Sequence, residues 1–339
     1  MDSRFPLLRL PSRAVLNVLQ SMDILEKITF SLISKTTKSY CLKIRLHACF
    51  DLNIKSTIGI EIYSGSSELA FELTPTAPHR RSDPPIRITT ANVVTVRKTV
   101  YMENILSNQP TTHELQKNGF DVKDWIWHMK DITKQRRIDI FMYANGARFD
   151  VDSIAEILVG FDIHQLSTHD LRANRFHRSI LEKIHTKSIT MSHNPYRRNP
   201  EQLQKILCQN FVLLSVLDKP TTLSDILVMN TPVILIDYCM VDAMKTINRF
   251  IKLWQAGSSG RLRYIRSMFE RDFIADANVI LKGIKHSVIG VEVQRPFVEL
   301  ISGRSGVRLL NGGYDLFRRD GTKATVFVRV EGFEMFVWD

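Results

Sequence analysis

The chain has 339 residues, enough for two or three domains, and its apolar (44%) and charged (24%) fractions are those of a globular protein. This composition excludes a chain that is disordered throughout. The opening residues, MDSRFPLLRLPSR, interrupt their apolar stretch with arginine, and no apolar run approaches the roughly 18 residues of a membrane span. The sequence therefore predicts an intracellular protein, in the cytoplasm and/or nucleus, with no membrane as a partner.

The formal net charge is +11, which raises the question of an anionic partner. The basic residues form short scattered groups: Arg80–Arg81, Lys134–Arg137, Arg197–Arg198 and Arg318–Arg319. No run of five basic residues and no known nucleic-acid-binding pattern accompanies them, so nucleic acid is not the expected partner. A repeat protein that binds nucleic acid through its basic surface is kept as the alternative function. An acidic protein partner would explain the charge equally well.

The residues that carry chemistry in enzymes do not gather into a known motif. The sequence contains no GxxxxGK[ST], GxGxxG, GxSxG or HExxH. His169, His177, His185 and His193 recur every eight residues, but metal ligands must converge on one point, and we interpret the spacing as coincidence. We expect no catalytic residue, no metal and no cofactor, and therefore a non-enzymatic protein.

The four cysteines lie far apart, without a CxxC pair. A secreted disulfide framework would be denser, and a zinc site would show paired spacing. We expect all four thiols to be reduced, and the apolar neighbours of Cys208 and Cys239 predict that these two lie in the core.

The first 45 residues have the pattern of short helices. Pro11 is placed for a first helical turn, where its missing N–H costs nothing. An apolar stripe at helical spacing follows, then a break at Ser21–Asp23 and a second apolar set: Val15, Val18, Leu19 and Met22, then Leu25, Ile28 and Leu32. Helices this short cannot bury all these side chains among themselves, so another surface must cover them.

From residue 46 to 150 the pattern changes to alternation of apolar and polar residues, as in FDLNIK, IGIEIYS, LAFELTP and IRITTANVVTVRK. The segment TPTAPHRRSDPP holds four prolines and predicts a loop. We expect a β-rich linking region that forms a small antiparallel sheet.

Between residues 151 and 285, helical segments alternate with short strand-like runs. These runs begin near Phe161, Ser188, Phe211, Pro232 and Leu262, at intervals of 27, 23, 21 and 30 residues. The intervals are close to the period of leucine-rich repeats, although the strict consensus is absent. The tail returns to alternating strands with a turn at Asp320–Gly321, and it is expected to pair back and cap the stack. The predicted fold class is α+β to α/β, with an irregular leucine-rich-repeat-like stack of strands and helices, ending in antiparallel strands, as the domain 151–339.

The segment Asn248–Ser258 is the densest in large side chains. Ile247, Phe250, Ile251 and Trp254 fall at helical spacing, so they predict a buried helix face that ends at Gly257. A tryptophan anchor for a ligand is the less favoured interpretation.

Two segments resemble a known family. FPLLRLPSRAVLNVLQSMDILEKITFSLISKTTKSYC resembles an F-box, in the divergent form expanded in nematodes. NRFIKLWQAGSSGRLRYI resembles the core of the type 2 F-box-associated region, through Asn248, Phe250, Lys252, Trp254, Gly257, Ser258, Arg261, Leu262 and Tyr264. The late DGTKATVFV and the terminal FEMFVW are similar to the end of that region.

The resemblance implies an F-box at 1–45 that docks a Skp-type adaptor and, through it, a cullin. It also implies a C-terminal domain that holds an unknown target protein for ubiquitination, with proximity as the whole of its catalytic contribution. The implied adaptor-binding residues are Leu8, Leu10, Pro11, Val18, Leu19, Met22 and Leu32. The motif residues with a structural or target-binding role would be Asn248, Phe250, Lys252, Trp254, Gly257 and Arg261. Ser12 and Arg13 stand where the family often has an acidic residue, which bears on adaptor affinity.

Overall fold

The computed structural model describes residues 7–44, 46, 48–73, 84–88, 91, 93–102, 105–106, 110–169, 173–196, 198–217, 221–237, 242–269, 274–299 and 306–338. The chain divides into two compact units, Met1–Asp162 (unit 1) and Ile163–Asp339 (unit 2). Most of the predicted proline-rich loop, residues 74–83, lies outside the described residues.

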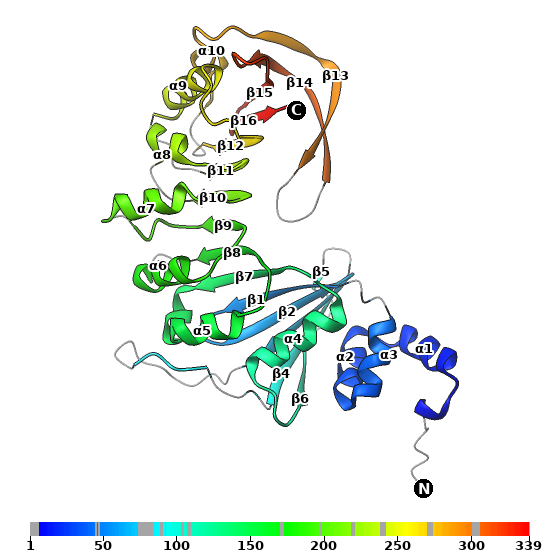
Figure 1. Ribbon diagram of the computed structural model, residues 1–339. Helices are drawn as coiled ribbons and strands as arrows, with labels where there is room; N and C mark the ends of the chain where they lie inside the picture. The colour runs from blue at the N-terminus through cyan, green and yellow to red at the C-terminus, as the bar shows by residue number, and fades with distance from the viewer. Residues whose placement is uncertain are drawn as a thin grey trace. The chain divides into compact units, whose positions relative to one another are not determined.

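Unit 1 begins with a 3₁₀ turn and three short helices (Figure 1): η1 (Leu7–Arg9), α1 (Ser12–Ser21), α2 (Ile24–Ile33) and α3 (Lys35–Lys43). Pro11 is the N-cap of α1, and α1 ends at Ser21, at the break that the sequence predicts. Asp23 caps α2 in a capping box with Glu26, and Ser34 caps α3 with Thr37. Two reciprocal caps at adjacent helix starts fix the sharp changes of chain direction.

The sheet of unit 1 is mostly antiparallel. Its strands are β1 (Cys49–Ile54), β2 (Ile58–Ser64), β3 (Ser67–Glu72), β4 (Val93–Met102), β5 (Ile105–Leu106), β6 (Thr111–Gln116) and β7 (Ile138–Tyr143). Within the unit the order is β7-β1-β2-β3-β4-β5, with β6 paired to β4 and β1 parallel to β7. Along β2, buried side chains alternate with more exposed ones, so the predicted period of two is confirmed for this strand.

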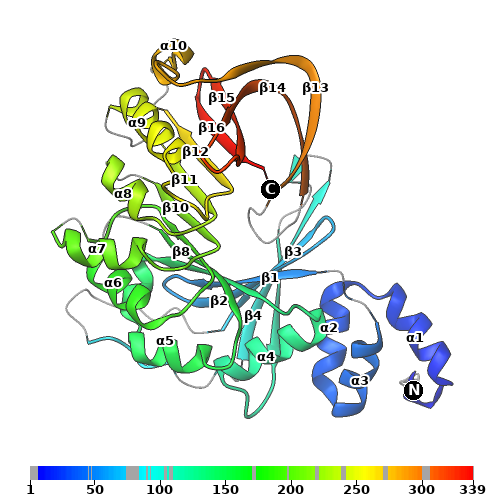
Figure 2. The same ribbon diagram turned by 45° about the horizontal axis from the view of Figure 1, so that its top comes forward.

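Unit 1 also contains helices that the β-rich prediction for 46–150 did not include. These are α4 (Val122–Thr133) and the short η2 (Ala144–Arg148), followed by α5 (Val151–Leu158), which the repeat pattern did predict. Helix α4 buries Val122, Trp125, Ile126 and Met129, which have helical spacing, and its capping box joins Asp121 to Asp124. Both signals are present in the sequence. Helix α4 contacts α2 and α3 (Figure 2), and it therefore covers part of the F-box-like helices from within the same chain.

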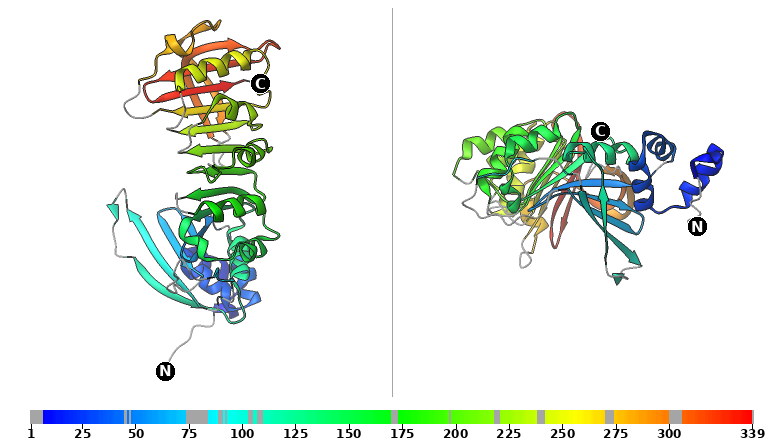
Figure 3. Two further views of the ribbon diagram at one scale, coloured as in Figure 1. Left: turned by 90° about the vertical axis from the view of Figure 1, so that its left-hand side faces the viewer. Right: turned by 90° about the horizontal axis from the view of Figure 1, so that it is seen from below.

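Unit 2 begins with parallel strands joined by helices: β8 (Ile163–His169), α6 (Asn174–Lys183), β9 (Ser188–Met191), α7 (Pro200–Leu207), β10 (Leu213–Leu217), α8 (Leu223–Val228), β11 (Val233–Asp237), α9 (Ala243–Gln255) and β12 (Tyr264–Met268). Neighbouring strands pair in sequence order from β8 to β12. The helices lie along one face of these strands, which are stacked one above another in Figure 3. Strands buried on both faces explain the near-continuous apolar runs LLSVL and VILID.

The end of unit 2 is antiparallel. After the short α10 (Ala277–Ile280), it contains β13 (Ser287–Glu299), β14 (Gly306–Phe317), β15 (Lys323–Arg329) and β16 (Gly332–Val337). Strand β16 pairs with β12, so the tail returns to the sheet as predicted. The turn between β14 and β15 places Gly321 at a φ of +90°, which glycine adopts without strain. Phe336, Phe297 and Tyr264 lie in one core cluster that joins β12 to the tail.

The cysteine predictions are confirmed in part. Cys41, Cys49 and Cys208 are free thiols. Cys208 is exposed, so its predicted place in the core is wrong: it follows the last turn of α7, and its neighbours Ile206 and Leu207 take the inward positions. Cys239 lies outside the described residues. In the part of the chain that the structure describes, none of the helices combines the length and the apolar character that a membrane crossing requires.

Candidate functional site

The F-box-like helices present two kinds of apolar side chain. Val15, Leu19 and Ile44 form a small buried cluster, against which Leu10 and Met22 pack in partly buried positions. Leu32 is also buried. These residues pack the helices against one another. The buried ones offer no surface to a partner, and the partly buried Leu10 and Met22 offer only part of their side chains.

Other apolar side chains of these helices face solvent. Leu8 has 47% of its surface exposed, and Ile33 at the end of α2 has 65%. Pro11 is exposed and Val18 is partly buried. Of the seven residues that the resemblance implies for adaptor binding, Leu8 and Pro11 are thus the most accessible. Ile33 was not on that list, although it follows Phe30 by one helical turn in the sequence and shares its face of α2.

The helices are tied to the rest of unit 1 by specific polar contacts. Ser31 Oγ lies 2.7 Å from His128 Nε2 of α4, and both side chains are buried. Lys38 Nζ forms an ion pair with Asp131 Oδ2 at 2.7 Å. Burial, with the nearby positive charge of Lys38, lowers the pKa of His128 to about 4. His128 is therefore neutral at pH 7, as a buried histidine without an ion-pair partner must be.

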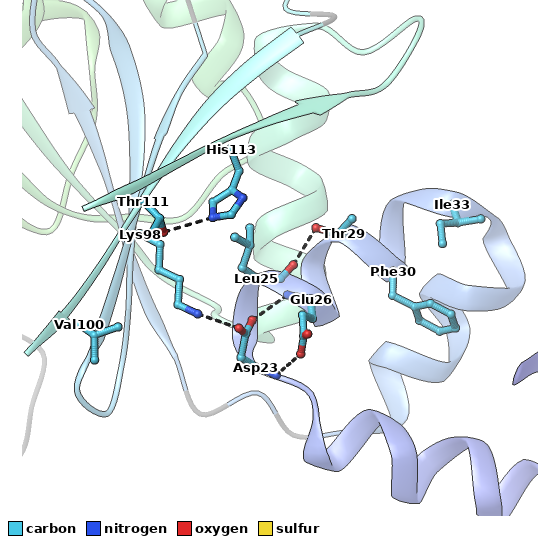
Figure 4. A pocket seen from close by; sticks show the side chains of 10 residues that line it. All are labelled: Asp23, Leu25, Glu26, Thr29, Phe30, Ile33, Lys98, Val100, Thr111 and His113. Carbon is cyan, nitrogen blue, oxygen red and sulfur yellow. Dashed lines mark hydrogen bonds and ion pairs between the residues drawn. The ribbon is translucent and has the colours of Figure 1, made fainter. Parts of the chain in front are cut away.

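A cavity of about 720 Å³ lies beside α2, between this helix and strands β4 and β6 (Figure 4). Phe30, Ile33 and Leu25 contribute apolar surface from α2, and Val100 contributes from β4. Lys98 Nζ donates to Asp23 Oδ2 at 2.7 Å across the opening.

Asp23, the N-cap residue of α2, is an acidic residue of the cavity wall, and it forms an ion pair with Lys98. Burial alone would raise the pKa of Asp23, but the hydrogen bonds from Lys98 and from the backbone N–H of Glu26 outweigh it and lower that pKa below its usual value. Asp23 thus stays ionised, and it holds the start of α2 and the β4 strand together.

The family-motif residues of unit 2 are placed mostly inside the structure. Phe250 and Trp254 of α9 are buried, as the helix-face interpretation predicts. Asn248 Nδ2 donates to the backbone carbonyls of Ile280 and Lys282, at 2.8 and 2.9 Å, and so fixes the segment that follows α10. Gly257 has a φ of +114° just after the helix end, a conformation that side chains other than glycine rarely adopt.

The two basic residues of the motif remain on the surface. Lys252 and Arg261 are exposed, and an Arg261 terminal nitrogen donates to Asn210 Oδ1. The tryptophan is therefore a core residue rather than a ligand anchor, and Lys252 and Arg261 are the charged motif residues that the surface exposes.

The structure brings two of the four regularly spaced histidines together. His177 Nδ1 lies 3.1 Å from His193 Nε2, and both rings are buried. Their separation of sixteen residues in sequence gave no signal for this contact. Among the residues described, no group of three or more histidine, cysteine, aspartate or glutamate side chains is arranged to hold a metal ion.

Comparison with protein families identifies two segments. Residues 7–48 match the F-box domain, and residues 202–267 match the family described as F-box associated. The chain thus combines an F-box with an F-box-associated region, and the resemblance inferred from the sequence is confirmed in both parts. A search of curated proteins gave no match. A search of solved structures also gave no match.

Proposed function

We propose that this protein is the substrate-recognition subunit of an SCF-type ubiquitin ligase. The observation that carries the proposal is the F-box match at residues 7–48, in the same chain as the F-box-associated match at 202–267. The helices α1 and α2 would dock a Skp-type adaptor, which joins the cullin. Unit 2 would hold a target protein, and the chain itself would perform no chemistry.

The exposed aliphatic side chains support the position of the adaptor surface. Exposed apolar residues that lie close together mark protein interaction sites more often than single ones do. Leu8 and Pro11 are exposed and lie three residues apart in the sequence, and Ile33 is exposed at the end of α2. We propose that adaptor contact is made through these residues, with Leu10, Val18 and Met22 at its margin and with Leu19 and Leu32 supporting it from the core.

The experiment is a pull-down of the full-length chain by a purified Skp-type adaptor. Leu8→Glu and Ile33→Glu add charge at exposed positions and leave the Val15–Leu19 core intact. Val159→Glu is the matched control, because Val159 is equally exposed (64%) in unit 1 but outside the F-box. We expect the control to be retained like the wild type and the other two variants to be lost.

Failure of the wild-type chain to bind any Skp-type adaptor would contradict the proposal. The alternative, a nucleic-acid-binding protein, would then be tested through the salt dependence of RNA binding, because phosphate contacts made by basic residues weaken steeply with salt. The net charge of +11 is the observation that keeps this alternative in view.

We further propose that the units from β8 to β12 are divergent leucine-rich-repeat-like elements. Parallel strands in sequence order, each joined to the next by a helix, support this interpretation. Deletion of one whole unit, such as residues 200–217, should then leave a folded, shortened stack, whereas a fold without repeat character would lose cooperative unfolding. We also propose an intracellular location, in cytoplasm and/or nucleus, which imaging of a fluorescent fusion would test.

A further inference from the structure

One face of the β13–β14 hairpin in unit 2 is apolar and exposed (Figure 1). In the register of the two strands, Pro296 lies opposite Leu309 and Val298 lies opposite Val307. Side chains at directly opposite positions share a face of the sheet, and so do residues two apart on one strand. Val298, Val307 and Leu309 are 57%, 66% and 62% exposed, and Pro296 is exposed as well. These four residues form what we call the hairpin face.

The opposite face of the same segment carries its charged residues. Arg295 lies opposite Leu310 there, and Phe297 lies opposite Arg308. Phe297 and Leu310 are buried in the core cluster of unit 2. Arg295 and Arg308 each form an ion pair with a buried carboxylate, at 2.9 and 2.7 Å. The arginines are thus held on the inner side while aliphatic side chains face solvent, which reverses the usual arrangement of a sheet with one solvated face.

The hairpin face is uncharged up to its margin. Gln294 and Asn311, the next opposite pair along the hairpin, are exposed on the same side. None of the six residues on this side carries a charge, although the chain as a whole has a net charge of +11. Four exposed aliphatic side chains make a patch of roughly a few hundred Å², a size at which an apolar patch on a monomer is often a site of interaction.

The backbone of β13 is less suited to a partner than its side chains are. Strand β13 stands at one end of the strand order, so it is an edge strand. Its register with β14 shifts between Ile289 and Gln294, and Pro296 has no backbone N–H to donate. Bulges and prolines are features that keep edge strands from pairing with further strands. A partner of this hairpin is therefore expected to pack on the hairpin face instead of extending the sheet.

We infer that the hairpin face is the contact surface between two copies of this chain. A contact between identical copies about a two-fold axis requires a surface that matches itself. The hairpin face meets this requirement, because aliphatic side chains would pack on aliphatic side chains. The amides of Gln294 and Asn311 both donate and accept, so they can pair with one another across the contact. An acidic partner attracted by the net charge would find no cation on this face.

The size of the hairpin face determines how tightly two copies would associate. A stable dimer buries about 800 Å² of each copy, which is more than four side chains supply. Val288 and Val291, elsewhere on β13, are 74% and 79% exposed and add apolar surface to the same strand. The net charge of +11 on each copy opposes association only weakly, since salt screens charges that lie more than about 8 Å apart. The expected dimer is therefore reversible, with a Kd in roughly the micromolar range.

The experiment is sedimentation equilibrium of the full-length chain, without any adaptor, at concentrations from about 1 to 200 μM. Leu309→Glu and Leu309→Lys each place a charge on the hairpin face at an exposed position, where no packed contact is lost. Val330→Glu is the matched control, because Val330 is 69% exposed in unit 2 but lies between β15 and β16, outside the hairpin. An equimolar mixture of the two Leu309 variants completes the set.

We expect the wild type and Val330→Glu to show the same monomer–dimer equilibrium. Each Leu309 variant alone should dimerise at least about tenfold more weakly, because like charges would meet in an apolar contact. The mixture should dimerise more tightly than either variant alone, since a face-to-face contact brings the opposite charges together. That recovery would also show that both variants are folded. Raising the salt concentration from about 0.1 to 0.5 M should not weaken the wild-type dimer, because its contact is uncharged.

A wild-type chain that stays monomeric at every concentration would overturn the inference, because a second copy would then not be the occupant of the hairpin face. Dimerisation of Leu309→Glu as tight as that of the wild type would overturn it as well, since the copies would then meet through another surface. The same conclusion would follow from a mixture that dimerises no more tightly than the single variants. None of these outcomes depends on adaptor binding, so they leave the proposed function to its own experiment.

Discussion

Helices α1 and α2 of unit 1 and helix α9 of unit 2 both carry family motifs, but they use their apolar residues in opposite ways. In α9 the large side chains are inside: Trp254 has none of its surface exposed. Around α1 and α2, Leu8 and Ile33 keep about half or more of their surface in solvent. The comparison teaches that a dense aromatic motif can be a structural signature, whereas sparse exposed aliphatic residues are the better candidates for docking.

The largest effect should come from Trp254→Ala. It removes a fully buried side chain from the face of α9 and should lower the free energy of unfolding of unit 2 by about 3–5 kcal/mol. The neighbouring Leu253→Ala, at a position 39% exposed on the same helix, should cost less than about 1 kcal/mol. Hydrogen exchange of the backbone amides in α9 and β12 measures the loss of stability in each variant. Equal losses in the two variants would contradict the assignment of Trp254 to a buried face and Leu253 to an exposed face.

The second prediction concerns pH and the contact of α2 with α4. The pKa of His128 is about 4 in the folded chain, against an ordinary value of 6.5, so the folded state takes up its proton at lower pH than the unfolded state. The stabilisation that neutral His128 permits is complete above pH 6.5 and is lost as the pH falls from 6.5 to about 4, by at most about 3 kcal/mol. Urea midpoints of the wild type and of His128→Gln across this range isolate the effect. If the midpoints of both proteins change identically with pH, His128 is not the cause of the pH dependence of stability.

The third prediction concerns the two hydrogen bonds that Asn248, a residue of the unit 2 motif, donates to backbone carbonyls. Asn248→Ala leaves the carbonyls of Ile280 and Lys282 without their donor and should cost about 1–3 kcal/mol. Asn248→Asp keeps the shape of the side chain but replaces the donor with a negative charge, so it should cost at least as much. Exchange protection at residues 280–284 measures the effect; an Asp variant as stable as the wild type would show that the two hydrogen bonds are not needed.

The smallest change in stability should come from the exposed residues of unit 1. Leu8→Glu and Ile33→Glu should each alter the free energy of unfolding by less than about 0.5 kcal/mol, because they break no packed contact. Their expected effect is the loss of adaptor binding. If a variant loses adaptor binding and also unfolds, the substituted residue is needed for folding, and the loss of binding is no evidence that it contacts the adaptor.

The sequence by itself predicted much of the local structure. Pro11 and the break at Ser21–Asp23 located α1 and α2, alternation located β1 to β4, and glycine at 257 and 321 marked the end of α9 and a hairpin turn. These signals are local, since each depends on residues within one turn or one strand. The β-rich prediction for residues 46–150 missed helix α4, although its capping box and apolar spacing are equally local, because most of that region alternates with the period of a strand.

Only the tertiary structure decided which residues meet. The contacts of Ser31 with His128, of His177 with His193, and of Arg308 and Arg329 with Glu334 join positions from different elements. Exposure was decided in the same way: Cys208 has apolar neighbours yet faces solvent, and Leu19 of the implied docking set is buried in the helices' own core. The physical reason is that a side-chain pattern specifies which face of an element is apolar, but not which other element covers that face.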